Sequence, residues 1–412
     1  MLMNNIIVQK YGGSSVANIE RIKKVAEKII EKAKEGNKMV VVVSAMGKTT
    51  DELTKMAGQI TSSPNERELD MLISTGEQVS IALLTMAIHS LGRDAISFTG
   101  MQAGIVTNTV HTKAKVSAVN HKKLKLALEK GKIVIVAGFQ GIDVNGDITT
   151  LGRGGSDTTA IALAARLEAS GCEIYTDVDG VYTADPRIVR TACRIPVISY
   201  DEMAEMASLG AKVMHYRAID LARNYKVKIL VKSSFIEGKG TLIKEADPML
   251  EKVIVRGVTQ ETNVGKIVIR GVPDVPGVAY KLFKAMAEKE IIVDMIIQSA
   301  HHNQVNDIAF TVALNDFDKS IRITKQIAKE IGAKEVISES EVAKVSIVGA
   351  GITSDPAIAA RMFGALAKEG VNIDMISTSG IKISCLVSSP RIEDAVRTIH
   401  KEFNLNKVGE EK

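Results

Sequence analysis

Five short, nearly continuous runs of apolar and β-branched residues recur through the first 235 residues of this 412-residue chain. Longer stretches with apolar residues at helical spacing separate them. The runs are IIVQK at 6–10, MVVVVSA at 39–45, KIVIVAGF at 132–139, CEIYTDV at 172–178 and VKILVKSS at 227–234. Strands that are apolar along their whole length are buried on both faces, as in parallel sheets. The pattern predicts an α/β fold, in which helices sandwich a mainly parallel sheet.

In folds of this kind, ligands bind in the loops that follow the carboxyl ends of the strands. We therefore expect a site in the loops that come after Gln9, Ser44, Ala137, Thr176 and Val231.

The C-terminal part contains an internal repeat. Residues 274–299 align without gaps with residues 354–379, so that Pro276 matches Pro356 and Asp294 matches Asp374. Each copy reads as strand, loop, helix and strand, followed by another strand and a helix. The repeat predicts two small modules of βαββα type.

These patterns divide the chain. The stretch 236–251 is rich in glycine and charge and contains Pro248, which indicates a linker or domain edge. We expect a first domain at 1–250, a first small module at 261–341 and a second at 342–412.

Composition excludes several classes of protein. A net charge of +5 is small for this length, and 4% aromatic residues without tryptophan give little material for base stacking, so nucleic acid is not an expected partner. The three cysteines are widely spaced and fit neither a disulfide framework nor a zinc site. We see no apolar run near 18 residues and no signal peptide, and we expect a cytoplasmic protein without a protein-bound metal.

The sequence KYGGSSV places a lysine and two glycines where the first strand leads into a helix. Glycines there allow backbone N–H groups to approach an anion, and Lys10 adds a positive charge. A tight turn with an exposed lysine is an equally good explanation of this motif alone.

A second glycine loop, LGRGGSDTTA, directly precedes an amphipathic helix. Ser156 or Asp157 can cap that helix, and Arg153 offers a two-pronged donor for a carboxylate or phosphate. Asp157 could be an N-cap only. Gly47-Lys48-Thr49 resembles a P-loop end, but Val42 stands where that motif requires glycine. The two glycine loops with their charged residues describe a phosphoryl-transfer site without a P-loop.

Six ordered motifs resemble one known family. The motifs KYGGSSV, VVVSAMGKTTDEL, STGEQVS, GRGGSDTTA, YTDVDGVYTADPR and GAKVMH are similar to those of aspartokinase, a member of the amino-acid kinase superfamily. The similarity covers the whole chain, because the repeated modules resemble that family's paired ACT domains. The implied reaction is attack by the β-carboxylate of L-aspartate on the γ-phosphate of ATP bound with Mg²⁺. That carboxylate is ionised at neutral pH, so no general base is needed.

The resemblance also implies roles for individual residues. Lys10 would neutralise the transferring phosphoryl group, and Asp157 would orient Lys10. Arg153 would bind the α-carboxylate of aspartate, and Glu77 its α-amino group. Further residues of the acceptor pocket would be Ser44, Thr50, Phe139 and Gly141. The implied nucleotide-binding positions are Lys10, Gly12, Gly13, Ser14, Thr176, Asp177, Tyr182, Asp185, Arg187 and Lys212.

The chain departs from the family pattern at two positions. Lys48 stands where relatives often have an acidic residue, and Tyr216 where they often have proline. These departures affect the acceptor loop and the surroundings of Lys212. The turn Asp185-Pro186-Arg187 could also be an ordinary loop.

By the same resemblance, the repeated modules would bind an end-product amino acid, lysine or threonine, and pair in a homodimer or larger homo-oligomer. The implied effector positions are Asp274, Gly277, Ala279, Gln298, Asn372 and Asp374. Each of them could instead cap a helix or end a strand.

Two other functions fit the sequence less well. A related kinase for acetylglutamate, glutamate or uridylate would not be expected to carry the paired repeat and the STGEQ motif. An inactive amino-acid sensor would have no reason to keep Lys10, Arg153 and Asp157 together.

Overall fold

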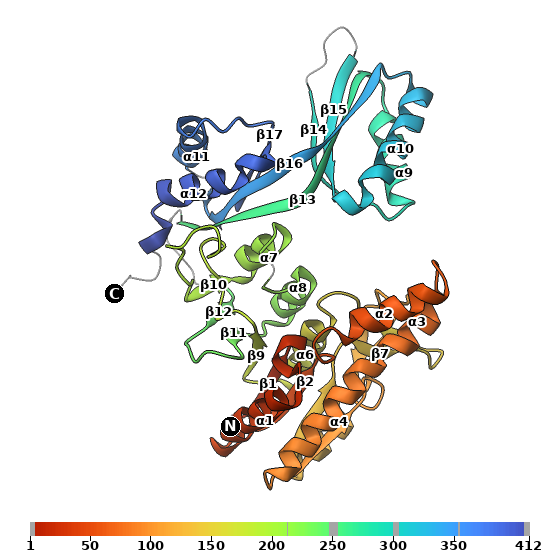
Figure 1. Ribbon diagram of the computed structural model, residues 1–412, viewed down its shortest axis with the longest axis vertical. Coiled ribbons are helices and arrows are strands. Elements are labelled where there is room, and N and C mark those ends of the chain that lie inside the picture. Colours follow the sequence, from red (N-terminus) through yellow and green to blue (C-terminus); the bar gives the residue numbers. More distant parts are fainter. Residues whose placement is uncertain (1–4, 212, 247–253, 300–304, 353–354, 408–412) are drawn as a thin grey trace. The chain divides into compact units, whose positions relative to one another are not determined.

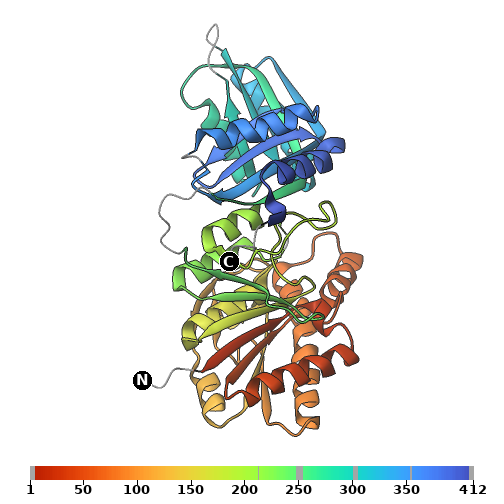
Figure 2. The ribbon, with the colours of Figure 1, turned by 90° about the vertical axis from the view of Figure 1, so that its left-hand side faces the viewer.

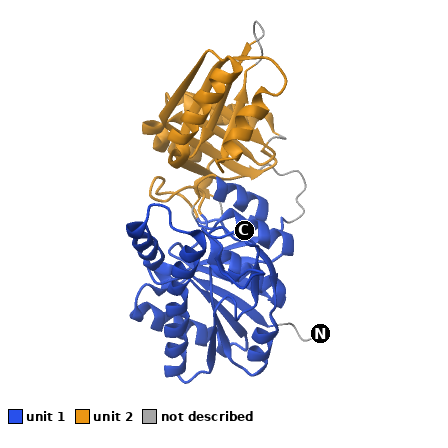
Figure 3. Cartoon of the chain, turned by 90° about the vertical axis from the view of Figure 1, so that its right-hand side faces the viewer, with its two compact units in different colours: residues 1–181, 194–208, 212–249 blue, residues 182–193, 209–211, 250–412 orange. Residues whose placement is uncertain are grey.

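The computed structural model describes residues 5–211, 213–246, 254–299, 305–352 and 355–407. The chain forms two compact units, which Figure 3 distinguishes by colour. The N-terminal unit comprises residues 1–181, 194–208 and 212–249. The C-terminal unit comprises residues 182–193, 209–211 and 250–412. Two segments that lie between parts of the N-terminal unit in the sequence, 182–193 and 209–211, therefore belong to the C-terminal unit.

The N-terminal unit is built on an eight-stranded sheet with the order β10-β12-β11-β9-β1-β2-β6-β3 (Figures 1 and 2). All neighbours are parallel except β11 and β12. The strands are β1 (Ile6–Tyr11), β2 (Lys38–Val43), β3 (Ala95–Phe98), β6 (Ile133–Ala137), β9 (Gly171–Thr176), β10 (Val197–Ser199), β11 (Ile229–Ser233) and β12 (Thr241–Lys244). The five predicted strands are confirmed, and so is the mainly parallel sheet.

The stretch 236–251, predicted to be a linker or domain edge, contains a strand of the first unit, and that unit ends at residue 249. Thr241–Lys244 forms β12, which pairs with β10 and β11 and therefore belongs to the first sheet. The sequence TLIK is short and flanked by glycine and charge, so its strand character depends on these neighbours. Residues 247–253, which include Pro248, lie outside the described part of the chain.

The sheet is covered by helices. The helices of this unit are α1 (Ile19–Lys34), α2 (Thr49–Ile60), α3 (Glu66–Ile73), α4 (Thr75–Ser90), α5 (Lys122–Glu129), α6 (Gly155–Leu167), α7 (Tyr200–Ser208) and α8 (Tyr216–Tyr225), with a 3₁₀ turn η1 (Gly13–Val16). A small second sheet has the order β5 (Val116–Val119), β4 (Ile105–Thr107), β7 (Gln140–Ile142) and β8 (Ile148–Thr150).

Alternation along the strands assigns side chains to the two faces of the main sheet. Tyr11 and Val41 share a buried core with residues of α1 and α4, such as Ile29 and Leu84. Val8 and Val40 are also buried but point to the opposite face, where α6 packs against β1. Lys10 has the same parity as Val8. It therefore faces α6.

The stretch 66–90, which contains α3 and α4, is long and apolar enough to span a membrane by length and composition. The prediction that no apolar run nears 18 residues is therefore wrong for this stretch. Half of its most apolar window is buried inside the protein, and Ile81 and Leu84 pack in the core with α1. It serves here as a core helix.

The C-terminal unit has one six-stranded antiparallel sheet with the order β14-β15-β13-β16-β18-β17. The first copy of the repeat contributes β13 (Ile254–Pro273), α9 (Val278–Ala287), β14 (Val293–Gln298), β15 (Val305–Val312) and α10 (Leu314–Ile331). The second contributes β16 (Glu335–Ala350), α11 (Pro356–Lys368), β17 (Met375–Ser379), β18 (Lys382–Ser388) and α12 (Ile392–Glu402), with the 3₁₀ turns η3 (Ser389–Arg391) and η4 (Leu405–Lys407). The two predicted βαββα modules are confirmed, and β13 and β16 join them.

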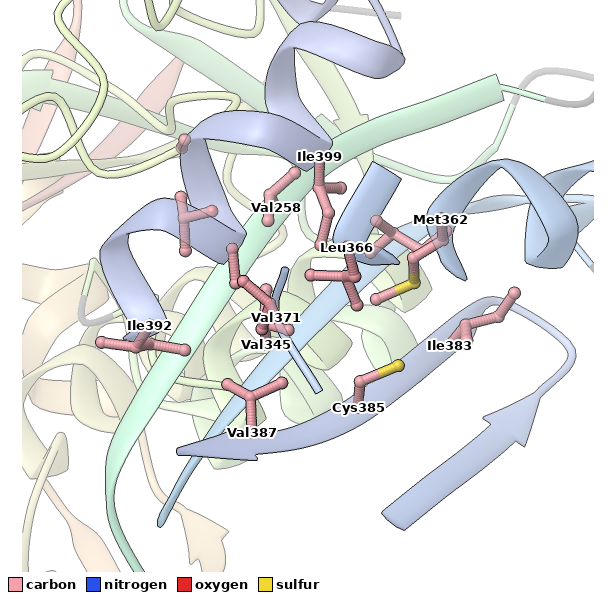
Figure 4. Close-up of a cluster of buried hydrophobic side chains, with 14 of the residues drawn as sticks. Val258, Val345, Met362, Leu366, Val371, Ile383, Cys385, Val387, Ile392 and Ile399 are labelled. Atoms are coloured by element: carbon pink, nitrogen blue, oxygen red, sulfur yellow. The ribbon is translucent and has the colours of Figure 1, made fainter. Parts of the chain in front are cut away.

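The two modules share their longest strand. The early part of β13, including Val258, pairs with β16 and is buried in the core of the second module, with Val345, Leu366 and Ile399 (Figure 4). The later part of β13, including Ile267, is buried in the core of the first module. Edge strands of both copies are thereby joined in the centre of one sheet.

Two ion pairs cross between the modules in opposite directions. Lys266 of the first module contacts Asp374 of the second, and Lys344 of the second contacts Asp294 of the first. Asp294 and Asp374 are equivalent positions of the repeat. Lys266 also contacts Glu339 at 2.8 Å.

The Lys344–Asp294 pair predicts an asymmetric effect on stability. The side chain of Lys344 is 5% exposed and that of Asp294 45% exposed. Asp294→Ala leaves a buried ammonium without its partner and should destabilise the C-terminal unit by about 1–3 kcal/mol. Lys344→Met leaves only a half-exposed carboxylate and should cost less. Differential scanning calorimetry of the full chain measures both, and an equal or larger loss for Lys344→Met would contradict this account.

Candidate active site

A cavity of about 510 Å³ lies in the N-terminal unit, where β1, β2 and β6 end. Loops after three of the five predicted strands contribute to its wall, together with the start of α6. Its lining residues are Lys10, Gly13, Ser44, Ala45, Gly47, Thr50, Thr54, Ile73, Glu77, Thr112, Phe139, Thr150, Gly152, Arg153, Gly154, Gly155, Ser156 and Asp157. The two glycine loops are thus brought to one site.

Lys10 and Asp157 form an ion pair in this cavity, with 2.7 Å between Nζ and Oδ1. Both side chains are largely buried. Asp157 does not cap α6, and neither does Ser156. The N-cap is Gly154, in a left-handed conformation (φ 69°), and it has no side chain to bond the helix. Because backbone geometry starts the helix, the carboxylate of Asp157 in the first turn is available to Lys10.

Close packing explains why the second glycine loop has glycine at positions 154 and 155. A Cβ on Gly154 would lie 2.3 Å from Cβ of His215, and one on Gly155 would lie 2.8 Å from the ring of Phe139. Burial lowers the pKa of His215, and the nearby cations Arg217 and Arg153 lower it further. The imidazole at this loop is therefore neutral at pH 7.

The first glycine loop differs from expectation in its local structure. The strand leads into the 3₁₀ turn η1, and α1 begins only at Ile19, after the cap Asn18. The N–H of Gly12 donates to the carbonyl of Tyr175 at 3.3 Å, so this amide already has a partner. Gly13 is closely packed, since a Cβ there would lie 2.8 Å from the carbonyl oxygen of Ala45.

Glu77 is a buried acid in the wall of the cavity. It is 2% exposed and lies in the first turn of α4, where Oε1 accepts a hydrogen bond from the N–H of Ala45 at 3.1 Å. Its other oxygen has no hydrogen-bond partner among the described residues. Burial raises the pKa of this carboxyl to about 7. A buried acid with a free oxygen is suited to bind a cation that enters the cavity.

Arg153 is exposed and has no hydrogen bond or ion pair with any other described residue. Arg153 lines the same cavity as Glu77. Among the described lining residues, the cavity therefore offers a cation and an acid that have no ion-pair partner, Arg153 and Glu77, in addition to the Lys10–Asp157 pair. Such a set matches a ligand that carries both charges.

The other predicted acceptor residues lie near these groups, with one exception. Ser44, Thr50 and Phe139 line the cavity, and Ser44 Oγ lies 3.0 Å from Ser156 Oγ. Phe139 has a left-handed backbone (φ 67°), which is uncommon for a bulky residue and typical of functional loops. Gly141 is in β7 and does not line the cavity; a Cβ there would lie 2.7 Å from the side chain of Thr107.

Sequence reasoning missed Thr54, Ile73, Thr112 and Thr150 as lining residues. Buried Asp70 connects two of them. It accepts hydrogen bonds from the N–H of Thr112 at 3.0 Å and from the hydroxyl of Thr150 at 2.5 Å. It also contacts His111 at 2.8 Å. No motif indicated this arrangement, because it joins segments about 40 and 80 positions apart.

The predicted nucleotide-binding residues fall into three groups. Gly12, Gly13 and Ser14 follow β1, Thr176 is the last residue of the adjacent β9, and Asp177 follows it. Tyr182, Asp185 and Arg187 belong to segment 182–193 of the C-terminal unit. Lys212 lies outside the described residues.

The turn at Asp185 is stabilised by contacts between Asp185 and Arg187 within the turn. Arg187 contacts the carboxylate of Asp185 at 2.7 Å through its guanidinium and at 2.9 Å through its backbone N–H. These contacts hold the pKa of Asp185 below its usual range. The guanidinium remains 88% exposed and can accept a further anionic partner.

The predicted effector positions lie in both modules. Gly277 is the N-cap of α9 with φ 97°, Ala279 is exposed in α9, and Gln298 ends β14. The carboxylate of Asp274 accepts a hydrogen bond from Asn306 at 3.4 Å. In the second module Asn372 is exposed, and Asp374 contacts Lys266 of the first module.

Comparisons with known proteins agree with this architecture. Residues 5–233 match the model of the amino acid kinase family, and residues 266–326 and 345–403 match that of an ACT domain. An aspartate kinase from Pseudomonas putida is 50% identical over 402 residues, which cover 97% of this chain and 98% of that protein.

Solved structures give the same result. Aspartokinase III of E. coli, in complex with aspartate and ADP (R-state), is 26% identical with a TM-score of 0.79, over 96% of this chain and 99% of that one. The same enzyme in complex with lysine and aspartate (T-state) is 27% identical with a TM-score of 0.77, over 97% and 99%.

The chain therefore belongs to the amino acid kinase family, and its C-terminal part carries ACT domains. Relatives that align over nearly the whole chain include an aspartate kinase and an aspartokinase, so the resemblance noted in the sequence is confirmed, as is the fold class.

Proposed function

We propose that the protein transfers the γ-phosphoryl group of ATP to the β-carboxylate of L-aspartate, giving β-aspartyl phosphate and ADP. The observation that carries this proposal is the charge content of one cavity. The Lys10–Asp157 pair lies there with the unpaired acid Glu77 and the unpaired cation Arg153. The product is a precursor for the biosynthesis of lysine, threonine and methionine.

In this reaction Lys10 neutralises the charge that develops on the transferring phosphoryl oxygens. Asp157 holds the Lys10 ammonium in position through the 2.7 Å contact. The β-carboxylate of aspartate is ionised at neutral pH and attacks in line, so no group has to remove a proton from it.

The acceptor is oriented by its α-substituents. Arg153 binds the α-carboxylate and Glu77 the α-ammonium, which leaves the β-carboxylate to react. Ser44, Thr50 and Phe139 shape the wall of this pocket, and Gly141 supports it from β7. Loss of one of these polar contacts would leave a buried group unpaired, which is how such sites discriminate between similar acids.

ATP binds along the loops that follow β1 and β9, with contacts from Gly12, Gly13, Ser14, Thr176 and Asp177. Tyr182, Asp185, Arg187 and Lys212 complete this set. Mg²⁺ bound with ATP supplies additional neutralisation of phosphate charge. The acidic side chains among the described lining residues are Glu77 and Asp157, and Asp157 is paired with Lys10. These residues do not form a carboxylate cluster that would hold Mg²⁺ by itself. The cavity therefore fits an ion that enters bound to the nucleotide.

The ACT modules make the enzyme responsive to an end-product amino acid, lysine or threonine. The positions proposed to contact this effector are Asp274, Gly277, Ala279, Gln298, Asn372 and Asp374. An E. coli relative has been solved with lysine, which supports this assignment. The modules also join identical chains into a homodimer or larger homo-oligomer, and the enzyme works in the cytoplasm.

The test of the proposed function is a measurement of ADP release with a panel of acceptors. L-aspartate should support turnover, whereas L-glutamate, N-acetylglutamate and uridylate should not. Each assay is repeated with lysine, threonine or both. ATP consumption that does not depend on L-aspartate would refute the proposal.

The raised pKa of Glu77 predicts a pH dependence. Its ordinary pKa is 4.5, and burial raises it to about 7, so the free enzyme holds an ionised Glu77 only above that pH. The kcat/KM for aspartate should therefore rise as pH increases through about 7 and level off above it. Burial lowers the pKa of His215, which moves its titration away from this window. Glu77→Gln should lower kcat/KM and remove the rise; a profile that keeps it would exclude Glu77 as its source.

A further inference from the structure

Arg153 lies in a loop that has little rigidity of its own. Its neighbours Gly152 and Gly154 both have left-handed backbone conformations, with φ of 71° and 69°. Glycine has more backbone freedom than any other residue, so a loop that contains two of them is not fixed by its local sequence. The position of Arg153 therefore depends on contacts that hold residues 150–152 from outside the loop.

A second segment, 112–114, lies against these residues. The N–H of Ala114 donates to the carbonyl of Thr150 at 2.9 Å. A Cβ on Gly152 would lie 3.0 Å from the carbonyl oxygen of Thr112, so the two segments are closely packed. Thr112 has a left-handed backbone (φ 60°), which is rare for a β-branched residue and persists only where its surroundings hold it.

Asp70 in α3 holds both segments. Its side chain is fully buried. The carboxylate accepts hydrogen bonds from the hydroxyl of Thr150 at 2.5 Å and from the N–H of Thr112 at 3.0 Å. Nδ1 of His111 lies 2.8 Å from the same carboxylate. A buried carboxylate is stable only when such donors surround it, so moving either segment away would leave it without partners.

Arg217 in α8 holds the same two segments through their carbonyl groups. Nη1 donates to the carbonyl of Leu151 at 2.9 Å, and Nη2 donates to that of Ala114 at 3.0 Å. Because the guanidinium is a rigid plane, these two bonds fix the distance between the segments. Neither Asp70 nor Arg217 is among the described residues that line the cavity, so each acts on it through these segments.

We propose that Asp70 and Arg217 are positioning residues for the acceptor. Together they fix segments 112–114 and 150–152, and they thereby hold Arg153 where it binds the α-carboxylate of aspartate. The inference rests on the proposed function, which assigns Arg153 to that carboxylate. The contacts to ATP are assigned to other loops, so loss of either positioning residue affects aspartate and leaves ATP binding intact.

The experiment measures L-aspartate binding to the full chain by calorimetric titration, together with the KM values for aspartate and ATP. Asp70→Ala and Arg217→Met should each weaken aspartate binding about 10-fold and raise the KM for aspartate by a similar factor, because a displaced Arg153 binds its carboxylate poorly. The KM for ATP should stay within about twofold, and kcat within about threefold.

Asp70→Asn separates hydrogen bonding from charge. The amide oxygen can still accept from Thr112 and Thr150, so this variant should keep aspartate binding within about threefold of the wild type. An equal loss in Asp70→Asn and Asp70→Ala would overturn the positioning role, because the bonds to the two segments would then not matter.

Double variants test whether the two residues act through Arg153. Once Arg153→Ala has removed the guanidinium, Asp70→Ala or Arg217→Met should raise the KM for aspartate by no more than about another twofold. Effects that multiply would mean that Asp70 and Arg217 act independently of Arg153, which contradicts the proposal. If Asp70→Ala does not fold, the cycle with Arg217→Met decides, because Arg217 is only partly buried.

Asp143→Ala is the matched control. Asp143 is also a buried carboxylate, and it accepts from the N–H groups of Asn145 and Asp147 at 2.9 Å within its own turn. It is not among the described lining residues. Its loss should lower the thermal midpoint and leave the KM for aspartate unchanged. A rise in KM equal to that of Asp70→Ala would reduce the role of Asp70 to general stability.

The same measurements separate this inference from the proposed function. A wild type that binds L-aspartate but releases no ADP would refute the proposed function, and titrations of the variants would still decide the positioning role. Unchanged aspartate binding in both Asp70→Ala and Arg217→Met would overturn the positioning role and leave the proposed function intact.

Discussion

Replacing Lys10 with alanine should lower kcat about 10²- to 10³-fold, with little effect on the KM for aspartate. The ammonium lies at the carboxyl end of the central strand β1 and is paired with Asp157. Its charge is most useful when negative charge spreads over the phosphoryl oxygens, so its loss appears in turnover more than in substrate binding. Single-turnover ADP formation measures the effect.

Asp157→Ala should produce a loss of similar size, because Lys10 then has no partner to fix it. The double variant should be about as slow as the slower single variant, since the pair acts as a unit. Lys38→Ala, at the exposed amino end of β2, is the matched control and should be as active as the wild type. Circular dichroism and a thermal midpoint check the fold. A normal kcat in Lys10→Ala or Asp157→Ala would contradict the assignment.

Replacing Arg153 with alanine should raise the KM for aspartate about 100-fold and leave the KM for ATP within about twofold. The guanidinium is exposed in the cavity and unpaired among the described residues, so its removal should cost the protein little stability. What is lost is a charge-assisted, two-pronged contact to a carboxylate. The initial rate as a function of aspartate concentration measures the change.

Arg153→Lys should recover only part of the affinity, because an ammonium cannot make the paired contacts of a guanidinium. Arg93→Ala removes an exposed arginine that does not line the cavity and should leave both KM values unchanged. If Arg153→Ala kept the wild-type KM for aspartate, Arg153 would have no place in the acceptor pocket.

Much of the architecture was predictable from local patterns. The five apolar runs became strands, because a run without polar positions is stable only where both faces are covered. The repeat at an offset of 80 residues gave two equivalent modules, since similar local sequences form similar small units. The glycine loops after Lys10 and before Asp157 were recognised as parts of one site, because parallel strands end at a common edge.

Other features depended on contacts that no local pattern specifies. Asp157 looked like a helix cap, but Gly154 starts the helix, and the carboxylate turns to Lys10. Thr241–Lys244 looked like part of a linker or domain edge and forms a strand beside β10 and β11. The partner of Asp157 is distant in the sequence, and β12 pairs with the distant β10 as well as with the nearby β11.

The sequence by itself determined five strands of the main sheet, which segments repeat and which charged groups belong together, because these follow from periodicity, glycine placement and ordered motifs. Only the tertiary structure decided how those groups behave. Burial of Glu77 in the first turn of α4 raises its pKa. Ala184 and Val189 are buried in the core of the second ACT module, so segment 182–193 belongs to the C-terminal unit. The physical reason is that desolvation and core packing are properties of residues distant in sequence that become neighbours only in the folded chain.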